Sequence, residues 1–268
     1  MPELDETVRR YYERGREVDR LKGGLRTGPL EFARTTRLLE RFLPLAPLDI
    51  LDVGGGPGAY AAWLCERGHR VHVVDPIPLH VEQAEATHPG VTGEIGDARD
   101  LRQESGSVDV VLLLGPLYHL VERADRLRAL GEARRVLRPG GVLVAAAISR
   151  FAGLLDLLVA ERLHEPDVQP LVAAALESGA FLGSGDGLFT TAYFHLPRDL
   201  RAEVAEAGFS AVQILSVEGP GFLVADFERR WADPVQRETM LWAAEVVESE
   251  PEILAASSHL LAVAQSPA

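Results

Sequence analysis

The sequence predicts an α/β fold built on a doubly wound parallel sheet, and three observations lead to this prediction. Short apolar segments alternate with helix-length segments from residue 49 to residue 148. Residues 108–114 are apolar apart from Asp109, and such a run is typical of a strand buried on both faces of a sheet. A glycine-rich turn follows the first apolar segment, where a strand would pass into a helix. This β-α-β-α rhythm indicates parallel strands with helices on both faces.

The expected elements follow from apolar periodicity and from the turn residues between them. Two helices are predicted between residues 5 and 43, before the first strand. In the core, strands are predicted at residues 49–53, 70–75, 91–95, 108–114 and 142–148, and helices at 60–67, 79–87 and 123–137. Beyond the core, a helix is predicted at 197–207, a strand at 211–217, a helix at 225–248 and a last strand at 259–265.

The chain is expected to form one domain over residues 1–268, a length compatible with a single α/β domain. We divide it into an N-terminal helical lid at 1–46, a cofactor-binding core at 47–150, a helical insertion at 151–196 and a C-terminal part of the core at 197–268. The insertion contains a glycine-rich stretch at 183–187. Our hypothesis is that this insertion is a cap that excludes water and binds an apolar small molecule.

Composition narrows the classes of partner. The net charge of −13 would repel a phosphate backbone, so we expect no nucleic-acid partner. No apolar run approaches the ~20 residues of a membrane span, and the first residues are acidic and polar, unlike a signal peptide. We therefore expect no membrane partner and a cytoplasmic location. Cys65 is the single cysteine, and no cluster of Cys and His has metal-ligand spacing, so we expect neither a disulfide nor a metal. Nothing in the sequence indicates an oligomeric state.

The glycine-rich turn begins at Asp52 and reads Asp-Val-Gly-Gly-Gly-Pro-Gly. Glycines here let the chain turn tightly and let a ligand approach closely, and the following helix presents free amide groups. Gly54, Gly56 and Ala59 fit the dinucleotide pattern G-x-G-x-x-G/A. Asp52, Gly54, Gly56 and Gly58 fit equally well the acidic-x-G-x-G-x-G pattern of S-adenosylmethionine binders. The turn alone leaves both cofactors open.

Further features follow the next three strands in order. Asp75 ends the second strand, where a carboxylate can accept from ribose hydroxyls. Asp97 and Ala98 follow the third strand and suit an adenine amino group and ring, and Leu114 and Gly115 end the fourth strand. Each acid also has a structural alternative as a turn residue or helix cap. With the glycine turn, this ordered set resembles the class I S-adenosylmethionine-dependent methyltransferases of the small-molecule type, over roughly residues 48–150.

The resemblance implies a Rossmann-like fold of seven strands, with antiparallel sixth and seventh strands at 211–217 and 259–265. It implies S-adenosyl-L-methionine as the cofactor and methyl transfer to an oxygen, nitrogen or carbon of a small-molecule metabolite. The residues expected to bind the cofactor are Asp52, Gly54, Gly55, Gly56, Gly58, Asp75, Pro76, Asp97, Ala98, Leu114 and Gly115. Two alternatives remain open: an NAD(P)-dependent oxidoreductase, and an S-adenosylmethionine-binding protein without methylating activity, such as a cyclase or a sensor.

The predicted lid adds two candidates for the cofactor site. Arg34 can pair with the methionine carboxylate of the cofactor, although Arg37 is nearly as suitable and an exposed arginine is the structural alternative. Tyr12 can close over the cofactor, or it can simply pack its helix on the sheet. The contacts of Arg34 and Tyr12 with the cofactor are expectations that follow from the resemblance.

Two histidines are candidates for a general base, which methyl transfer needs only when the nucleophile arrives protonated. His119 comes just after the fourth strand, at the carboxyl edge where ligands of open α/β sheets bind. His195 follows the insertion. A loop histidine bonded to the backbone is the alternative for His119. The stretch after the fourth strand, Gly115-Pro116-Leu117-Tyr118, departs from the pattern of enzymes that methylate nucleobase amino groups.

Aromatic residues are candidates for the acceptor pocket. Tyr118 follows the fourth strand, Tyr193 lies near the end of the insertion, and Phe222 and Trp231 lie in the C-terminal part. The alternative is that such aromatics form a local hydrophobic core. The identity of the methyl acceptor cannot be read from the sequence.

Overall fold

The computed structural model describes residues 4–183 and 187–268, so residues 184–186 of the glycine-rich stretch in the insertion lie outside the described part. The helices up to the fifth strand are α1 (Glu6–Tyr12), α2 (Glu17–Asp19), η1 (Arg20–Gly24), α3 (Gly28–Phe42), α4 (Ala59–Cys65), α5 (Pro78–Thr87), η2 (Pro116–His119) and α6 (Arg123–Val136). The later ones are α7 (Ala152–Val159), α8 (Val168–Ser178), α9 (Pro197–Glu206), η3 (Gly219–Leu223), α10 (Phe227–Ala232), α11 (Pro234–Val246) and η4 (Leu254–Ala256).

The strands are β1 (Asp49–Val53), β2 (Arg70–Asp75), β3 (Val91–Ile95), β4 (Val108–Leu113), β5 (Leu137–Ser149), β6 (Ala180–Leu182), β7 (Thr191–His195), β8 (Ser210–Ser216) and β9 (His259–Gln265). Parallel pairing gives the order β3-β2-β1-β4-β5, and β9 then pairs antiparallel with β5 and with β8. The sheet is therefore doubly wound, with its order reversing between β1 and β4. Ligands of open α/β sheets bind at such a reversal.

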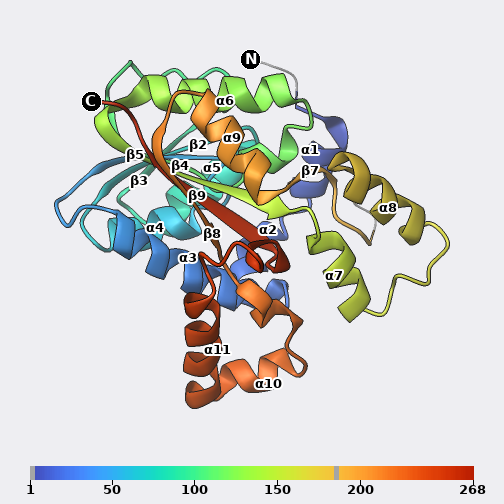
Figure 1. Cartoon of the computed structure of the whole chain (residues 1–268). Coiled ribbons are helices and arrows are strands. Elements are labelled where there is room, and N and C mark those ends of the chain that lie inside the picture. Colours follow the sequence, from blue (N-terminus) through green and yellow to red (C-terminus); the bar gives the residue numbers. More distant parts are fainter. Residues whose placement is uncertain (1–3, 184–186) are drawn as a thin grey trace.

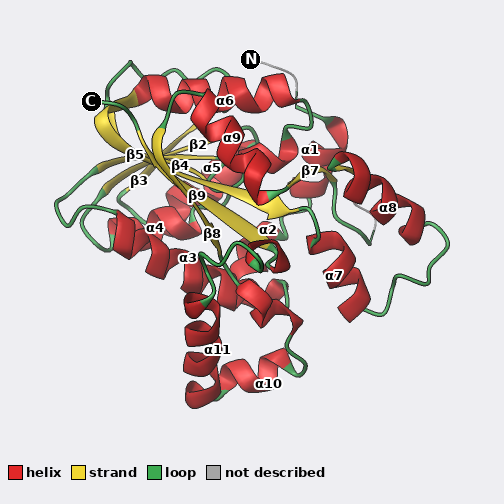
Figure 2. Ribbon diagram, viewed as in Figure 1, coloured by secondary structure: helices red, strands yellow, loops and turns green. Residues whose placement is uncertain are grey.

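Helices cover both faces of the sheet, as Figure 2 shows. One face is packed by α6 and α9, and its core includes Leu51, Val111 and Leu143. The other face is packed by α3, α4 and α5 against the alternate side chains of the same strands. Residues 110–113 of β4 are fully buried on both faces of the sheet, which is why the sequence is uninterruptedly apolar from 110 to 114. The predicted Rossmann-like fold is confirmed.

Two details of the C-terminal part differ from expectation. Because β8 pairs antiparallel with β9, and β9 antiparallel with β5, β8 runs in the same direction as the parallel strands. The prediction of two antiparallel strands is therefore wrong for β8. The helix expected at 225–248 is broken, because Asp233 caps a new helix and Pro234 begins it. The resulting α10 and α11 extend away from the sheet (Figure 1).

The insertion holds two strands that the sequence did not predict, together with its two helices α7 and α8. β6 and β7 form an antiparallel hairpin, and β7 pairs in parallel with the end of β5 at Ile148 and Ser149. At Ile148, β5 already pairs with β9 on its other edge. Consequently β7 lies on the β4 side of β5, beyond the point where β4 ends. The hairpin thus extends the sheet over the carboxyl end of β4.

The N-terminal segment is helical, with α1, α2, η1 and α3 before β1. Asp5 caps α1 by accepting from the amide groups of Thr7 and Val8. Tyr11 of α1 packs edge-on against Phe189, which lies just before β7, with ring centres 5.6 Å apart. Figure 1 shows the position of α1 in the fold. Across residues 4–183 and 187–268, no helix combines the length and the apolar character that spanning a membrane requires.

Candidate active site

A cavity of about 840 Å³ opens at the carboxyl ends of β1, β2 and β4. Its volume is within the range of small-molecule sites. The cavity is lined mainly by the N-terminal lid, the glycine turn after β1, the end of β2, the loop after β3, and η2 with the residues around it. Residues of α4, α5 and β7 complete the lining. The cavity therefore lies where the strand order of the sheet reverses.

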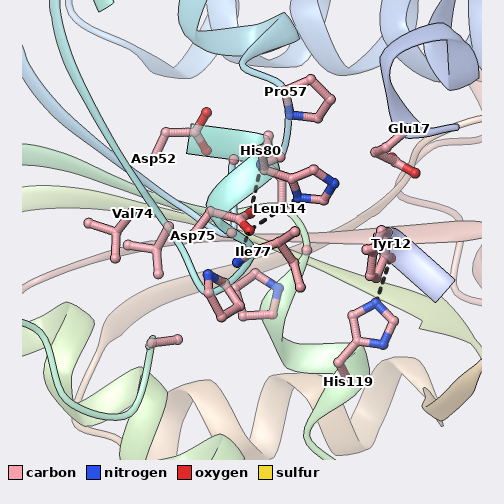
Figure 3. A pocket seen from close by; sticks show the side chains of 18 of the residues that line it. Tyr12, Glu17, Asp52, Pro57, Val74, Asp75, Ile77, His80, Leu114 and His119 are labelled. Carbon is pink, nitrogen blue, oxygen red and sulfur yellow. Dashed lines mark hydrogen bonds and ion pairs between the residues drawn. The ribbon is translucent and has the colours of Figure 1, made fainter. Parts of the chain in front are cut away.

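The structure brings most of the predicted residues to this cavity. Those that line it are Tyr12, Asp52, Gly54, Gly55, Gly56, Asp75, Pro76, Asp97, Ala98, Leu114, Gly115, Tyr118 and His119. The predicted residues that do not line the cavity are Gly58, Arg34, His195, Tyr193, Phe222 and Trp231. Figure 3 shows several of the lining side chains around the end of β2.

The glycines of the turn have distinct tasks. Gly56 has φ +55° and lines the cavity, and a Cβ placed there would lie 3.7 Å from Cγ of the lid residue Glu17. Gly58 has φ +81°, and its Cβ would lie 2.9 Å from Cβ of Ala84. Gly58 therefore permits close packing of α4 on α5, and the expectation that it contacts a cofactor is not met.

Asp52 is a fully buried carboxyl beneath the turn. Its side chain is 0% exposed, and neither oxygen has a hydrogen-bond partner among the described residues. Burial, reinforced by the nearby Asp75, raises the pKa of Asp52 to about 7. A Cβ at Gly55 would lie 2.6 Å from Asp52 Oδ2, so only glycine fits above this carboxyl. The site thus holds an unpaired acid that a cationic ligand would stabilise.

Three hydrogen bonds hold the carboxylate of Asp75 at the end of β2. Its Oδ2 accepts from the amide of Gly56 at 3.0 Å, and its Oδ1 accepts from the amide of Ile77 at 2.9 Å. His80 on α5 donates from Nδ1 to Oδ1 over 3.1 Å. These bonds tie the glycine turn to β2 and leave one of the four acceptor positions of the carboxylate for a ligand.

Asp97 is engaged by a residue that the sequence did not single out. Arg99 donates from Nε and Nη2 to the two oxygens of Asp97, at 2.9 and 2.8 Å. Arg99 also donates to Asp125 over 2.7 Å, and all three side chains line the cavity. This bidentate pair fixes the plane of the Asp97 carboxylate at the end of β3.

His119 and Tyr12 meet across the cavity wall, as Figure 3 shows. The Tyr12 hydroxyl lies 2.7 Å from Nε2 of His119, and Nδ1 of His119 lies 3.2 Å from the carbonyl oxygen of Thr191 on β7. A carbonyl only accepts, so Nδ1 carries the proton and Nε2 accepts from Tyr12. Burial lowers the pKa of His119 to about 4, and burial raises that of Tyr12 above its usual value. The imidazole is therefore neutral at pH 7.

A series of partly and fully buried charged side chains runs from the lid to β9. Arg20 lines the cavity, pairs with Glu17, and donates to Glu31 on α3 at 2.6 Å. His259 lies 3.9 Å from Glu31 and 2.6 Å from Glu218. Burial opposes ionisation of His259, but Glu218 and Glu31 outweigh it and raise the pKa to about 9. This series anchors the lid to the end of the sheet.

Within the described part of the chain, Glu31, Glu218 and His259 are the group whose spacing would suit a metal ion. Their ligand atoms are already engaged, because His259 is bonded to Glu218 and Glu31 is bonded to Arg20. The arrangement is that of an ion-pair network.

Arg34 is not at the cavity. Its side chain is 1% exposed, donates to the Val217 carbonyl at 3.1 Å and pairs with Glu248 at 2.5 Å. It therefore fastens α3 to the C-terminal part, and Arg37, the alternative, pairs with Glu238. The guanidinium that the lid does bring to the cavity belongs to Arg20.

His195 and Tyr193 belong to a separate buried cluster. His195 is 0% exposed and bonds Glu203 at 3.2 Å, and Glu203 also accepts from Arg126. The guanidinium carbon of Arg126 lies 3.7 Å from the centre of the Tyr193 ring. This cluster joins α6, β7 and α9, and it offers neither a base nor an acceptor contact.

Phe222 and Trp231 also have packing roles. Phe222 is 1% exposed, and its carbonyl accepts from Arg26 at 2.6 Å. Trp231 stacks on Phe227 with ring centres 5.5 Å apart, in a small core that includes Leu30. The structural alternative considered for these aromatics therefore describes them correctly.

The charges along the cavity distinguish the candidate cofactors. Its acidic side chains are Asp5, Glu6, Glu17, Asp52, Glu66, Asp75, Asp97, Glu122 and Asp125, and its basic ones are Arg20, Lys22 and Arg99. The sulfonium and ammonium of S-adenosylmethionine suit this excess of carboxylates and the unpaired Asp52. The pyrophosphate of a nicotinamide dinucleotide would be repelled by it. The residues present therefore fit S-adenosylmethionine.

Comparisons with known proteins agree with this geometry. Residues 50–141 match the family model described as a methyltransferase domain. An uncharacterized methyltransferase of Mycobacterium tuberculosis is 39% identical over 105 residues, which are 39% of this chain and 42% of that protein. A ubiquinone biosynthesis O-methyltransferase of Methylocella silvestris is 33% identical over 111 residues, 40% of this chain and 42% of that protein. The chain thus matches about two fifths of the length of these curated relatives.

The fold is shared over a longer stretch. An S-adenosylmethionine-dependent methyltransferase from Methanosarcina mazei superimposes with a TM-score of 0.58 and 16% identity, covering 86% of this chain and 97% of that one. The sequence match spans the glycine turn, Asp75 and Asp97, and the structural match extends the likeness of the fold to most of the chain. Residues 50–141 therefore match a methyltransferase domain, and the chain has the fold of S-adenosylmethionine-dependent methyltransferases, whose cofactor the residues of the cavity fit.

Proposed function

We propose that this protein transfers the methyl group of S-adenosylmethionine to an oxygen, nitrogen or carbon nucleophile of a small-molecule metabolite. The observation that carries the proposal is the cavity itself, which joins the glycine turn to the Tyr12–His119 pair. When bound, the cofactor supplies an electrophilic methyl group. The protein must then orient the acceptor, exclude water and accept a proton when the acceptor carries one.

Several residues are arranged to hold the cofactor. Asp52 places a negative charge beneath the glycine turn, and Asp97 lies beside Ala98 after β3. We assign the methionine carboxylate to Arg20, because it lines the cavity and Arg34 does not. Glu17 lies against Gly56, which places the lid directly over the turn.

His119 is the proposed base. Its proton-bearing Nδ1 is fixed by the Thr191 carbonyl, so its lone pair on Nε2 faces Tyr12. An acceptor proton can pass to the Tyr12 oxygen while the Tyr12 proton passes to Nε2. Positioning is the larger contribution, up to ~7–11 kcal/mol of the barrier, and the base adds roughly 10²–10⁴ in rate.

The acceptor wall comes mainly from the lid. Leu4, Val8, Val18 and Leu21 line the cavity, whereas Thr191 is the residue of the insertion that does so in the described ranges. The insertion acts through the hairpin that covers β4, and Phe189 packs at 5.7 Å from His119. We therefore propose that residues 4–22 chiefly determine which acceptor shapes fit the cavity. The insertion covers the cavity from outside.

A titration of the purified full chain tests the cofactor. S-adenosylhomocysteine is expected to bind, and NADH and NADPH are not. Gly56→Ala should weaken S-adenosylhomocysteine binding by about tenfold or more, because Gly56 lines the cavity and the new Cβ would take up space beside the cofactor. Gly106→Ala is the matched control: Gly106 has φ +66°, and a Cβ there would have open space. Equal losses for both variants would contradict the assignment of the turn.

A second experiment tests the chemistry. The chain is incubated with S-adenosylmethionine labelled in the methyl group and a panel of phenols, amines and carbon acids, and products are detected by a mass gain of one methylene. A methylated product supports the proposal. Tight binding of S-adenosylhomocysteine without any product across a broad panel would favour a binding protein over a methyltransferase, and binding of NADH would favour an oxidoreductase.

A further inference from the structure

His80 is a buried side chain with an unused polar atom at the cavity. It lies on the first turn of α5, it is 2% exposed, and it lines the cavity beside Asp75. Its Nε2 is buried and has no hydrogen-bond partner among the described residues. A buried polar atom without a partner costs about 1–3 kcal/mol, so such atoms in native proteins call for an explanation.

The hydrogen bond to Asp75 fixes which ring nitrogen of His80 carries a proton. Nδ1 lies 3.1 Å from Oδ1 of Asp75, and a carboxylate can only accept, so Nδ1 carries a proton. In the neutral ring, Nε2 is then an acceptor. Asp75 thereby fixes the orientation of the imidazole as well as its tautomer.

The lid covers this acceptor. The ring of Tyr12 lies edge-on to His80 with centres 5.4 Å apart, while its hydroxyl bonds His119. Figure 3 places His80 between Asp75 and Tyr12. Water is therefore kept from Nε2 when the lid is in place, and a ligand inside the cavity is the remaining source of a donor.

We propose that His80 Nε2 accepts a hydrogen bond from a ribose hydroxyl of the cofactor, next to the hydroxyl that Asp75 accepts. This inference rests on the proposed function. Its location supports it, because Asp75 follows the glycine turn by the spacing at which ribose-binding acids occur in Rossmann-like folds, and its Oδ2 is bonded to the amide of Gly56. Together Asp75 and His80 offer two adjacent acceptors for two adjacent hydroxyl groups.

The experiment combines ligand and protein changes. S-adenosylhomocysteine and its 2′-deoxy and 3′-deoxy analogues are titrated into the wild type and into His80→Asn, whose amide nitrogen can still donate to Asp75 but leaves nothing at the position of Nε2. Wild type should lose about tenfold in affinity for one of the deoxy analogues. His80→Asn should bind S-adenosylhomocysteine about tenfold less tightly than the wild type does. It should bind the deoxy analogue that the wild type discriminates against no less tightly than it binds S-adenosylhomocysteine.

Two more variants sharpen the result. His80→Gln, which restores a polar atom near the position of Nε2, should recover part of the affinity. His72→Asn is the matched control, because His72 on β2 bonds Thr92 and does not line the cavity. It should bind all three ligands as the wild type does.

If His80 Nε2 accepts from neither hydroxyl, the fold-loss of affinity caused by His80→Asn and the fold-loss caused by removing a hydroxyl are independent. The inference would therefore be overturned if, for both deoxy analogues, the affinity loss in His80→Asn equalled the product of these two separate losses. It would also be overturned if the ¹⁵N resonance of Nε2 in the wild type did not move on adding S-adenosylhomocysteine, a readout that needs no variant to fold. A wild type that fails to bind S-adenosylhomocysteine at all would instead remove the cofactor assignment.

Discussion

Replacing Asp52 with asparagine should change how the stability of this protein depends on pH. Asp52 is fully buried without a hydrogen-bond partner among the described residues, and its pKa is raised from 3.8 to about 7. Between these two pH values the folded state holds a proton that the unfolded state has released. By linkage, the carboxyl lowers stability progressively as the pH rises through this window.

The magnitude follows from the size of the shift. A difference of about three pKa units corresponds to up to about 4 kcal/mol, fully developed above pH 7 and absent below about pH 4. Asparagine has no such titration. The stability of Asp52→Asn relative to the wild type should therefore rise by up to about 4 kcal/mol between pH 4 and pH 8. Any cost of burying the amide is independent of pH and cancels in that difference.

Urea unfolding at half-unit pH intervals, without cofactor, measures this difference directly. Glu104→Gln removes an exposed carboxyl and serves as the control, for which the difference from the wild type should stay flat. A flat difference for Asp52→Asn as well would refute the idea that the carboxyl is buried and unpaired in the free protein.

The other predictions concern the cofactor, the base and the packing. Because the ammonium group of bound S-adenosylhomocysteine favours ionised Asp52, affinity for this ligand should fall by up to about tenfold per pH unit below pH 7 in calorimetric titrations, and Asp52→Asn should remove the slope. Tyr12→Phe and His119→Ala should each lower kcat by roughly 10²-fold or more on an acceptor found in the panel; unchanged turnover would exclude the pair from the chemistry. His259, with a pKa of about 9, stabilises the fold fully below pH 6.5 and loses that contribution as the pH rises through 9; His259→Gln should abolish this loss of about 3 kcal/mol in urea unfolding, and an unchanged slope would contradict it. Gly58→Ala should cost about 1–3 kcal/mol of stability because of its positive φ and the contact with α5, yet leave S-adenosylhomocysteine affinity intact once folded; weakened binding would return Gly58 to the cofactor site.

The fold was predictable because its signals are local. Buried parallel strands are apolar throughout, and the turn residues between them are contiguous in sequence. The hairpin of the insertion was missed because β6 has three residues and β7 pairs with β5 through two, which leaves no periodicity to detect. The direction of β8 depends on its pairing with β9, which no local pattern encodes.

The residues of the site could be predicted where a local motif places them at the cavity. They were missed where contacts between segments distant in the sequence determine which side chain lies at the cavity. Asp52, Asp75 and Asp97 lie at or just after the carboxyl ends of predicted strands, so the sequence placed them at the same edge of the sheet. Arg34 and Arg20 both lie in the helical N-terminal region, and only the contact of Arg34 with Glu248, 214 residues away in the chain, shows that Arg34 is not the one at the cavity. His80 falls in the helix predicted at 79–87, and no local pattern shows that it is buried, because Tyr12, which packs on it, is distant in the sequence.

The hairpin beyond the end of β4 has a consequence for how this scaffold can be diversified. Its strand β7 carries the carbonyl of Thr191 that holds the proton on Nδ1 of His119. A segment that looks like a removable cover therefore also dictates which nitrogen of the base is free. Exchanging the insertion between relatives would change the proton chemistry together with the acceptor range, and a chimera that keeps the position of this one carbonyl should keep the pH profile of its parent.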